Sequence, residues 1–475
     1  MVIYIFGLWI HDYRIHHANV ESRKHIRNKV IKIMDNSTVV LIITFLMVLM
    51  ILCGVYVSVA LGLMSVVGLW IITGQPSTAI NLLATTFFSS LQSYEFGVIP
   101  LFVLMGAVFG NGLSEELFAA ANVLVRKIRG GLAMATVMGN AVFAAITGSS
   151  MASAAAFSKI SYPPMLKMGY DKRFALGTVA GSSILGMLIP PSILFIIYGI
   201  LTQVSIGKLF IAGVIPGLLM AVIFCIGILL IGYWKPEWVG AHLKQHDQEA
   251  DAQSFAQKMV ILFKPWPVIL LIMVVIGGIY SGYFTPNESA AVGAIGAIII
   301  AVSKKQLDMP GFKKAVYEVG MTTGSIMLLL VCAQMYSRMV ALSGLVQGLD
   351  QWFRASAWSG MGILWAFIGI ILFLGCILDS ASILLLIVPI AFPILTGMGF
   401  DPLWIGVVLV IAVEVGLVSP PFGMCVFTVA ASVGKSITST QVFAGVMPYL
   451  LMMLVCLGLV VEFPSLSTWL VKYMN

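Results

Sequence analysis

The chain has 475 residues, of which 60% are hydrophobic and only 9% are charged, a composition far from that of soluble globular proteins. The net charge of +7 does not indicate a nucleic-acid partner, because the basic residues stand mostly in short loops between apolar runs. Apolar runs long enough to cross a hydrocarbon core of ~30 Å recur from Ser37 to the C-terminus, and their continuous character excludes membrane β-strands. The composition therefore predicts an all-α polytopic protein in a lipid bilayer.

Residues 1–36 form a basic leader that precedes the first long apolar run. Its segment from Arg23 to Lys32 spaces its apolar residues like an amphipathic helix lying on a membrane surface. A poorly ordered leader explains the same pattern equally well. The side of the membrane on which residues 1–36 lie stays open.

A first repeat is expected over residues 37–234. Its first part comprises two spans that turn near Gly54–Ser58 or near Gly62, an interfacial arm over Gln75–Tyr94, a membrane segment over Phe96–Gly112 and a surface helix over Ser114–Arg129. Two apolar arms of about 15 residues then surround a small, polar tip at Thr147–Ser153, too short for two full spans. They predict a re-entrant hairpin over about 131–167.

One span over about 172–204 is interrupted by Pro190 and Pro191, and an apolar helix closes the first repeat. Residues 235–264 form the long hydrophilic segment, which we expect to be a cytoplasmic linker. The second repeat, 265–475, follows the same plan, with a hairpin over about 362–399 and a broken helix over about 402–430. In its opening part, Thr285-Pro-Asn-Glu288 is typical of a capped helix start.

The two repeats share the residues that interrupt their helices. Pro420 and Pro421 lie 230 positions after Pro190 and Pro191, and Gly416 lies 230 positions after Gly186. The hairpin tips align with an offset of 231, which places Ser380 opposite Ser149. Proline removes a backbone donor, and interrupted backbone at membrane depth is tolerated where it faces protein or a cavity. Broken helices at matching positions of two halves indicate a transporter binding site.

Loop charges predict that the two repeats are inverted. Basic residues flank the first hairpin and fill the loop around Lys304, whereas the loops beside the second hairpin, Ser356–Gly362 and Thr396–Pro402, carry no Lys or Arg. By the positive-inside rule the first hairpin opens to the cytoplasm and the second to the opposite side. The two tips can then meet near the midplane of the bilayer.

Oxygen atoms dominate the candidate sites at the tips. Ser149 and Ser150 add hydroxyls to the carbonyls freed at the first tip, a ligand set suited to a hard cation such as Na⁺. Asp379 and Glu414 are acids within apolar segments of the second repeat, which makes them functional candidates, with helix capping as the alternative. They face Gly148 and Ile184 of the first repeat. Arg338 is either an anion contact or a residue that reaches the membrane surface.

The motifs that carry these features resemble the large membrane subunit of tripartite ATP-independent periplasmic (TRAP) transporters. They are GSSMASAAA (148–156), LIPPSILFIIYG (188–199), TPNESAAVGA (285–294), LDSASILLLIVPI (378–390) and EVGLVSPPFGMCVF (414–427). The resemblance covers Asn36 to Phe463. It implies sodium-driven, elevator-type uptake of an organic acid across a bacterial inner membrane, together with a periplasmic binding protein and a small four-helix membrane subunit as a separate chain.

The resemblance also implies the site residues. One sodium site would use Ser149, Ser150, Gly186, Ile189 and Pro191; a second would use Gly375, Asp379, Gly416, Ser419 and Phe422. The substrate would lie near Ser150, Ser192 and Asp379. The family often has Thr where Ser419 stands, and Ser keeps the hydroxyl. Sodium is the coupling ion, and no organic cofactor is expected.

Two other functions compete with this interpretation. A self-sufficient sodium-coupled dicarboxylate symporter would share the inverted repeats and hairpins, although the Pro-Pro and TPNE motifs argue against it. An intramembrane hydrolase using Asp379 and Glu414 is a remote alternative, because no nucleophile, metal or ATP-binding motif accompanies them. We therefore expect no enzyme activity. Sialic acid, C4-dicarboxylates and sugar acids all remain open as substrates.

Overall fold

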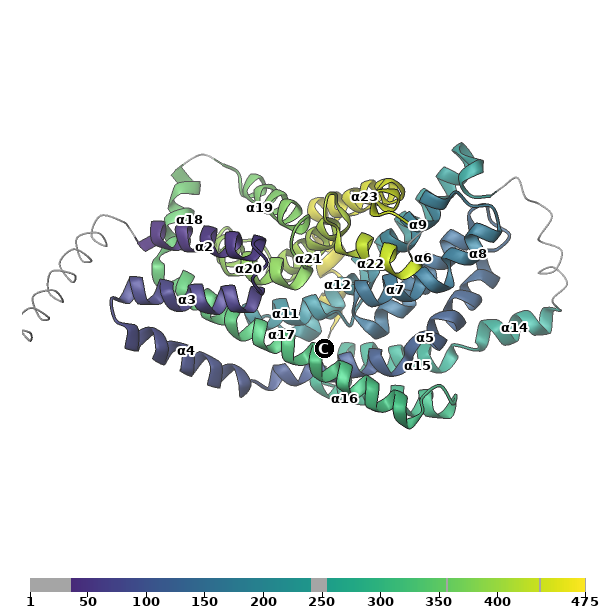
Figure 1. Ribbon diagram of the computed structural model, residues 1–475, viewed down its shortest axis with the longest axis horizontal. Coiled ribbons are helices and arrows are strands. Elements are labelled where there is room, and N and C mark those ends of the chain that lie inside the picture. The colour runs from purple at the N-terminus through teal and green to yellow at the C-terminus, as the bar shows by residue number, and fades with distance from the viewer. Residues whose placement is uncertain (1–35, 241–253, 356–357, 435–436, 475) are drawn as a thin grey trace, which may run out of the picture. The chain divides into compact units, whose positions relative to one another are not determined.

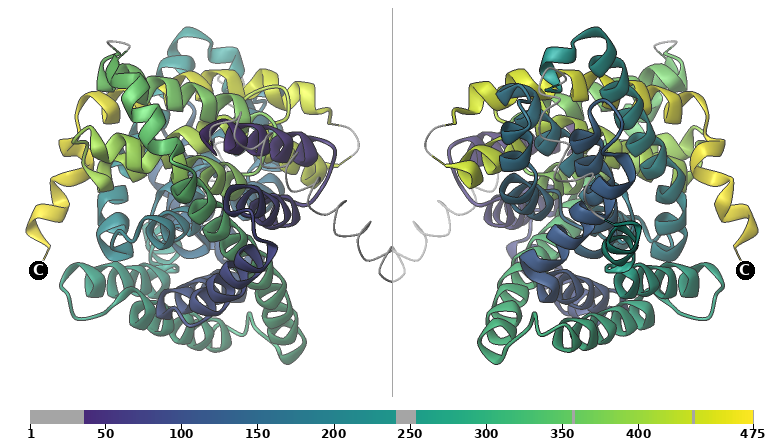
Figure 2. Two further views of the ribbon diagram at one scale, coloured as in Figure 1. Left: turned by 90° about the vertical axis from the view of Figure 1, so that its left-hand side faces the viewer. Right: turned by 90° about the vertical axis from the view of Figure 1, so that its right-hand side faces the viewer.

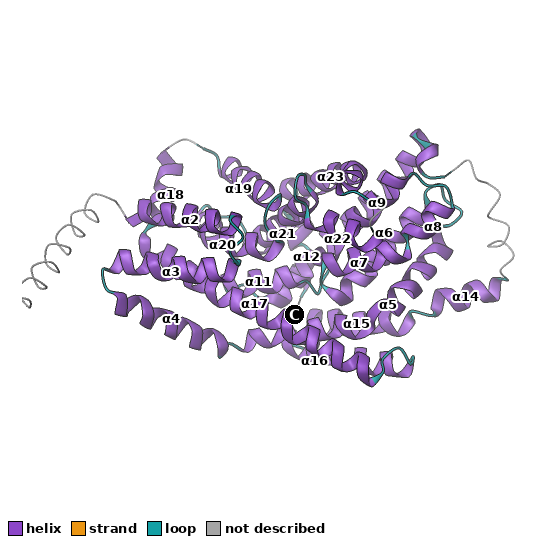
Figure 3. Cartoon of the chain, viewed as in Figure 1, coloured by secondary structure: helices purple, strands orange, loops and turns teal. Residues whose placement is uncertain are grey.

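The computed structural model describes residues 36–240, 254–355, 358–434 and 437–474, which are mainly helical (Figures 1 and 3). Within these ranges the structure contains no β-strand, and its one isolated antiparallel bridge joins Tyr170 and Val239. The predicted all-α polytopic fold is confirmed. The basic leader, apart from Asn36, lies outside the described residues.

Seven helices in the described part of the chain are long and apolar enough to cross a membrane, or eight if a pair bent by 57° near residue 92 counts as one span. They differ in how deeply they are buried. The interrupted span Lys172–Thr202 has 89% of its most apolar window buried, against 22% for Phe255–Tyr280. The span with the broken backbone is thus enclosed by protein, where its freed polar groups find partners.

The chain divides into two compact units, and the first comprises residues 1–88 and 332–356. Its described helices are α2 (Asn36–Leu52), α3 (Val57–Thr73), most of α4 (Pro76–Leu91), the end of α17 (Met309–Ser343) and α18 (Leu345–Ala355). Helices α2 and α3 pack side by side, and α18 packs on α2 (Figure 1). Thr44 and the Tyr336 hydroxyl share a 3.1 Å hydrogen bond that joins α2 to α17.

The second unit, residues 89–331 and 357–475, contains both hairpins and both broken helices. Its first-half helices are α5 (Val98–Val125), α6 (Gly131–Thr147), α7 (Ser150–Ile160), α8 (Tyr162–Lys167), α9 (Lys172–Ser183), α10 (Leu185–Leu188), α11 (Ile193–Thr202) and α12 (Ile206–Trp234). Its second-half helices are α14 (Phe255–Phe263), α15 (Trp266–Tyr280), α16 (Pro286–Ser303), most of α17, α19 (Gly360–Gly375), α20 (Ser380–Gly397), α21 (Pro402–Val418), α22 (Met424–Val433), α23 (Ser439–Glu462) and α24 (Ser465–Thr468). Among the described residues of this unit, short 3₁₀ turns lie at Tyr94–Gly97, Pro236–Trp238 and Leu470–Tyr473.

The two repeats interlock within this unit. In each repeat the first arm of the hairpin packs on the broken helix, α6 on α9 and α19 on α21. Between repeats the packing is reciprocal, because α7 contacts α22 and α11 contacts α20. Figure 2 shows the yellow C-terminal helices among the blue and teal ones. Helices α9 and α23 approach so closely that a Cβ on Gly177 would lie 1.9 Å from the Gly445 carbonyl oxygen.

Aspartates begin the broken helices of both repeats in the same way. The Asp171 carboxylate accepts a 2.9 Å hydrogen bond from the Phe174 amide at the start of α9. Asp401, 230 positions later, accepts bonds of 2.8 and 3.0 Å from the amides of Leu403 and Trp404 at the start of α21. Each satisfies amides that the first helical turn leaves unpaired. The predicted cap at Thr285 and Glu288 is also confirmed as a reciprocal capping box.

One expectation about helix boundaries was wrong. The sequence predicted a membrane segment ending at Gly112 and a separate surface helix from Ser114, but α5 runs continuously from Val98 to Val125. It packs against α6 and α16, and this tertiary packing overrides the helix-breaking preference of the glycines near residue 110. Helix α14, Phe255–Phe263, lies within residues 235–264, for which the hydrophilic linker stays a prediction.

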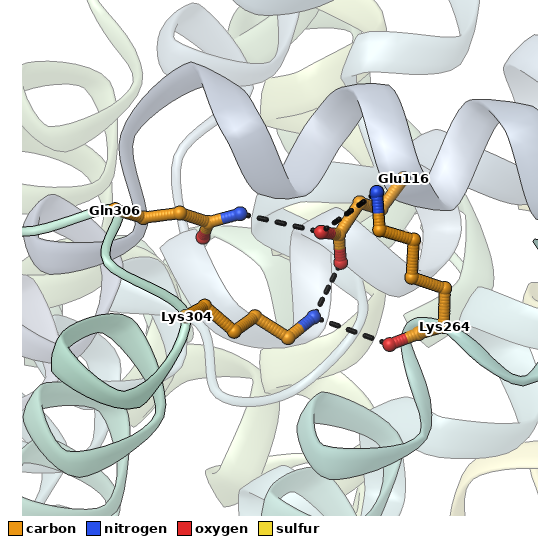
Figure 4. Close-up of polar contacts among 4 residues, drawn as sticks. All are labelled: Glu116, Lys264, Lys304 and Gln306. Carbon is orange, nitrogen blue, oxygen red and sulfur yellow. Dashed lines mark hydrogen bonds and ion pairs between the residues drawn. The ribbon is translucent and has the colours of Figure 1, made fainter.

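A charged cluster ties α5 to the second repeat (Figure 4). The Glu116 side chain on α5 is 7% exposed. Its carboxylate accepts one hydrogen bond from Lys304 Nζ and another from Gln306 Nε2 at 3.2 Å. Lys264 Nζ lies 3.6 Å from Glu116 Oε1, and Lys304 also donates to the Lys264 carbonyl at 3.1 Å. One acid therefore neutralises part of the basic loop that the sequence had indicated.

Candidate functional site

The first hairpin turns at Gly148 and Ser149. Helix α6 ends there because Gly148 adopts a left-handed conformation, with φ of 57°, that favours glycine. Ser149 is extended and caps α7, its hydroxyl accepting a 3.3 Å hydrogen bond from the Ala152 amide. The following Ser150 is fully buried. The tip thus holds one accessible hydroxyl and one hydroxyl enclosed by protein.

The first broken helix is interrupted directly beside this tip. Helix α10 ends at Leu188, the Pro190–Pro191 peptide is cis, and Ser192 caps α11 by accepting from the Phe195 amide at 3.5 Å. The Ser192 hydroxyl also donates to the Met187 carbonyl across the break. Because Ser192 is fully buried, its hydroxyl is committed to the protein in this conformation.

Glycines bring the first tip and the first break into contact. A Cβ on Gly186 would lie 2.7 Å from the carbonyl carbon and oxygen of Ser149, and one on Gly148 would lie 2.8 Å from the Pro191 carbonyl oxygen. Real Cβ atoms do not approach that closely, so both positions require glycine. The structure thereby gathers Ser149, Ser150, Gly186 and Pro191, four of the five residues expected at the first sodium site.

The second hairpin meets the second break in the same manner. Helix α19 ends at Gly375, where a Cβ would lie 2.5 Å from the Gly416 Cα of α21. Cys376 at the tip also donates from Sγ to the Pro420 carbonyl at 2.9 Å. The Ser419 hydroxyl donates to the Val415 carbonyl at 2.8 Å and keeps its lone pairs available. The second predicted site therefore has its two glycines, Gly375 and Gly416, in contact, with the proline pair that interrupts the helix beside them.

In the second predicted site, the side chain of Asp379 is engaged in capping a helix, and the side chain of Phe422 has no oxygen to offer an ion. The Asp379 carboxylate caps α20, accepting from the Ser382 amide at 3.2 Å and from the Ser382 hydroxyl. Capping was the structural alternative to ion binding for this acid, and here the side chain performs it. Phe422 exposes 57% of its surface, so its backbone carbonyl is the group that can offer an oxygen to an ion.

Glu414 connects the two hairpin tips. The Ser150 hydroxyl donates to Glu414 Oε2 at 2.6 Å, and the Ser380 hydroxyl donates to Oε1 at 3.2 Å. Glu414 is only 1% exposed, and no ion pair to it occurs in the described part of the chain. Its carboxylate therefore depends on hydroxyls from both repeats. Ile184, its counterpart in the first repeat, lies close by, with its carbonyl 3.5 Å from Ser150 Oγ.

The structure changes the register of the two tips by one residue. Ser149 and Asp379 are both helix caps, of α7 and α20, so Asp379 corresponds to Ser149 and Ser380 to Ser150. The sequence alignment had placed Ser380 opposite Ser149 and Asp379 opposite Gly148. With the corrected register the offset is 230 throughout the site, and each repeat contributes one hydroxyl to Glu414.

A cavity of about 350 Å³ opens beside the first tip. Thr147, Ser149 and Ile193 are among its lining residues, and Lys159 and Glu318 are the charged ones. Ser150, Ser192 and Asp379, the residues expected to contact substrate, are not among its lining residues. Of the two adjacent serines at the tip, Ser149 lines this cavity and Ser150 does not.

The family of the chain follows from comparison with known proteins. A family model described as "Tripartite ATP-independent periplasmic transporter, DctM component" matches residues 43–466. The chain belongs to this family. It is thus a multi-pass TRAP permease subunit, as the motifs around both tips had indicated.

Relatives from two bacteria align with most of this TRAP permease. It is 32% identical over 399 residues to the C4-dicarboxylate TRAP transporter large permease protein DctM of Pseudomonas aeruginosa, covering 84% of this chain and 91% of that one. It is 32% identical over 394 residues to the sialic acid TRAP transporter large permease protein SiaM of Vibrio cholerae, covering 82% and 89%. The YdaH transporter of Alcanivorax borkumensis has a similar fold, with a TM-score of 0.54, 15% identity and coverage of 82% and 89%.

Sequence reasoning missed two features of the site. It quoted Ser380 in the tip motif without a role, because the partner of its hydroxyl stands 34 positions away on another helix. It did not consider Lys159, whose position ten residues after Ser149 on α7 could have suggested a cation along the same helix. Arg338 is half-buried on α17 in the first unit.

Proposed function

We propose that this TRAP permease takes up an organic acid by coupling its movement to an inward sodium gradient. The substrate class is supported by relatives whose names specify C4-dicarboxylates and sialic acid. These two classes, together with sugar acids, are the substrates that the proposal includes. The proposed function includes no enzymatic reaction, and the sequence around the site carries none of the enzyme motifs considered above.

The observation that carries the sodium proposal is the matched contact of each tip with its own break. Glycines allow the backbone of each hairpin to touch the interrupted helix, where carbonyls leave the regular helical pattern. Sodium prefers such oxygen ligands. We assign one ion to Ser149, Ser150, Gly186, Ile189 and Pro191, and one to Gly375, Asp379, Gly416, Ser419 and Phe422.

The interlocked packing supports an elevator mechanism. Hairpins and broken helices of both repeats contact one another reciprocally, and Glu414 links their tips, so they would travel as one body. Substrate would bind between the tips, near Ser150, Ser192 and Asp379, and the cavity beside Ser149 would be its opening on one side. Glu414 would keep the two sodium sites in a fixed relation during this movement.

Tripartite transport requires two further proteins. Family membership supports a periplasmic binding protein, which delivers the substrate, and a small four-helix membrane subunit. In the proposal both are separate chains, and all act at the bacterial inner membrane. The self-sufficient symporter remains the competing function, since its fold would also place hairpins against broken helices.

Reconstitution in liposomes distinguishes these functions. The lone permease, an inward sodium gradient and radiolabelled succinate or sialic acid should give no measurable uptake. Adding the small subunit and the binding protein loaded with its acid should produce uptake, and collapsing the gradient with a sodium ionophore should abolish it. Robust uptake by the lone chain would instead establish the symporter. Uptake by the complete system that ignores the gradient would exclude sodium coupling.

A further inference from the structure

The break in the first repeat lies directly against α12, the helix that follows it. Helix α12 packs on both α10 and α11, which flank the break. Two buried glycines, Gly213 and Gly217, stand four residues apart and share one face of α12. A Cβ on Gly213 would lie 3.2 Å from the Leu188 carbonyl oxygen. A Cβ on Gly217 would lie 2.7 Å from Ile189 Cγ1, so α12 closely contacts the last two residues before the proline pair.

Ile189 has little freedom to move away from Gly217. Its backbone is extended, with φ of −79° and ψ of 125°, and a residue that precedes proline is restricted to conformations of this kind. Its Cγ1 is bonded to Cβ and lies near the backbone, unlike the far end of a long side chain. A displacement of this atom would therefore also displace the Ile189 backbone and its carbonyl oxygen.

The Ile189 carbonyl can serve as an ion ligand. The two residues that follow, Pro190 and Pro191, have no N–H group to donate to it. No backbone N–H group in the described part of the chain donates to this carbonyl either. Ile189 is also the fifth residue expected at the first sodium site, beside the four that the glycines of the first tip and break gather. Its carbonyl therefore keeps its lone pairs for a cation.

We propose that Gly217 is a positioning residue for the first sodium site. By leaving room for the Ile189 side chain, it holds the Ile189 carbonyl where an ion can bind. The proposal rests on the proposed function in assigning a sodium ion to the first tip and break. Gly217 itself does not touch the ion and acts through Ile189.

The second repeat has a different residue at this position. Tyr449 lies 232 positions after Gly217, the same offset that relates Pro448 to Pro216. The Tyr449 hydroxyl shares a 2.8 Å hydrogen bond with Thr178 on α9. A Cβ on Gly181, also on α9, would lie 2.5 Å from Tyr449 Cβ. Helix α23 thus uses this position to pack on α9, and we expect positioning by a glycine of the closing helix at the first site alone.

Sodium-dependent thermal unfolding of the purified permease tests the role of Gly217. Bound sodium should raise the melting temperature, with choline chloride keeping the ionic strength constant. In Gly217→Ala the sodium concentration that gives half of this rise should increase about 5-fold or more, because the new methyl group overlaps Ile189 Cγ1. Gly232→Ala on the same helix meets nothing closer than 3.4 Å and should leave that concentration unchanged. A purely structural defect would lower the melting temperature at every sodium concentration without changing it.

A second substitution tests whether Gly217 acts through Ile189. Ile189→Ala removes Cγ1, so that the nearest Ile189 atom to the new methyl group is Cα, at 3.4 Å. In this background Gly217→Ala should increase the half-effect sodium concentration less than about twofold. If Gly217→Ala alone does not fold, Ile189→Ala should restore its folding, and a double variant that still does not fold would overturn the proposal.

Two further results would overturn the positioning role. One is a half-effect concentration in Gly217→Ala equal to that in Gly232→Ala, and the other is the same increase with and without Ile189→Ala. Both leave the proposed function intact, because the unchanged protein would still respond to sodium. A melting temperature of the unchanged protein that does not respond to sodium would instead contradict the proposed function, and this proposal with it.

Discussion

Ser150 and Glu414 stand 264 positions apart, in different repeats, and are joined by a 2.6 Å hydrogen bond within the protein interior. Ser150 begins the second arm of the first hairpin, and Glu414 lies on the broken helix of the second repeat. With Ser380 as the other donor, the carboxylate connects both tips. This bridge explains why an acid is retained deep in an apolar segment of the second repeat without a counterpart in the first.

Removing the Glu414 carboxylate should destabilise the protein. In Glu414→Ala the hydroxyls of Ser150 and Ser380 lose their acceptor, which costs about 1–3 kcal/mol for each buried group left unpaired. Glu414→Gln keeps the side-chain shape and one acceptor oxygen, and its amide NH₂ can donate to the other serine hydroxyl, so its loss should be smaller. Thermal unfolding in detergent measures the order. Glu462→Ala, at the exposed end of α23, is the control, and a Glu414→Ala melting temperature equal to that of the control would disprove the bridge.

The contact between Gly375 and Gly416 should not tolerate a methyl group. Gly375→Ala would place Cβ 2.5 Å from a backbone atom, which cannot move aside as a side chain could. We expect uptake to be lost and the melting temperature to fall. Gly369→Ala on the same helix meets nothing within 4 Å and should leave both unchanged, because alanine also favours the helix. If the two variants behave alike, the tip does not require this approach.

The Glu116 cluster should stabilise the fold independently of transport chemistry. Glu116→Gln removes the charge that pairs with Lys304 and Lys264, and because Glu116 is 7% exposed we expect a loss of about 1–3 kcal/mol. Glu318→Gln removes an exposed pair with Lys314, 3.9 Å long, and should have little effect. Melting temperatures of the two variants make the comparison. A larger effect of Glu318→Gln would contradict this account of the cluster.

The inverted orientation of the repeats stays a prediction that labelling can decide. Single cysteines at the exposed positions Lys167 and Lys313 should react with an impermeant reagent from the cytoplasmic side. A cysteine at Ser359, which precedes α19, should react from the periplasmic side. The native cysteines are replaced in each variant. Labelling of positions 167 and 359 from one side would rule out inversion.

Local signals in the sequence were sufficient for the elements around the site. Proline pairs located both breaks, small residues located both tips, and Thr285 with Glu288 located a capped helix, because each acts through its own backbone. The continuous course of α5 was not predicted, since its packing partners α6 and α16 override local preference.

Long-range relations could not be read from one sequence. Glu414 receives hydrogen bonds from residues 34 and 264 positions away, and nothing in its neighbours indicates either donor. The one-residue error between the tips arose because Ser149 and Ser380 are both serines, whereas the matching caps are Ser149 and Asp379. Matching two serine hydroxyls does not align the two tips correctly, whereas matching the residues that begin α7 and α20 does.

The sodium dependence of uptake tests the central claim most directly. Ser150→Ala and Ser419→Ala should each raise the sodium concentration for half-maximal uptake several-fold, because each removes one oxygen ligand. Ser303→Ala is matched to Ser419→Ala, since both hydroxyls donate to the carbonyl four residues earlier, at 2.7 and 2.8 Å. It lies at the end of α16 and should leave that concentration unchanged. If the sodium concentration for half-maximal uptake is the same in Ser150→Ala and Ser419→Ala as in Ser303→Ala, sodium binding at the hairpin tips is contradicted.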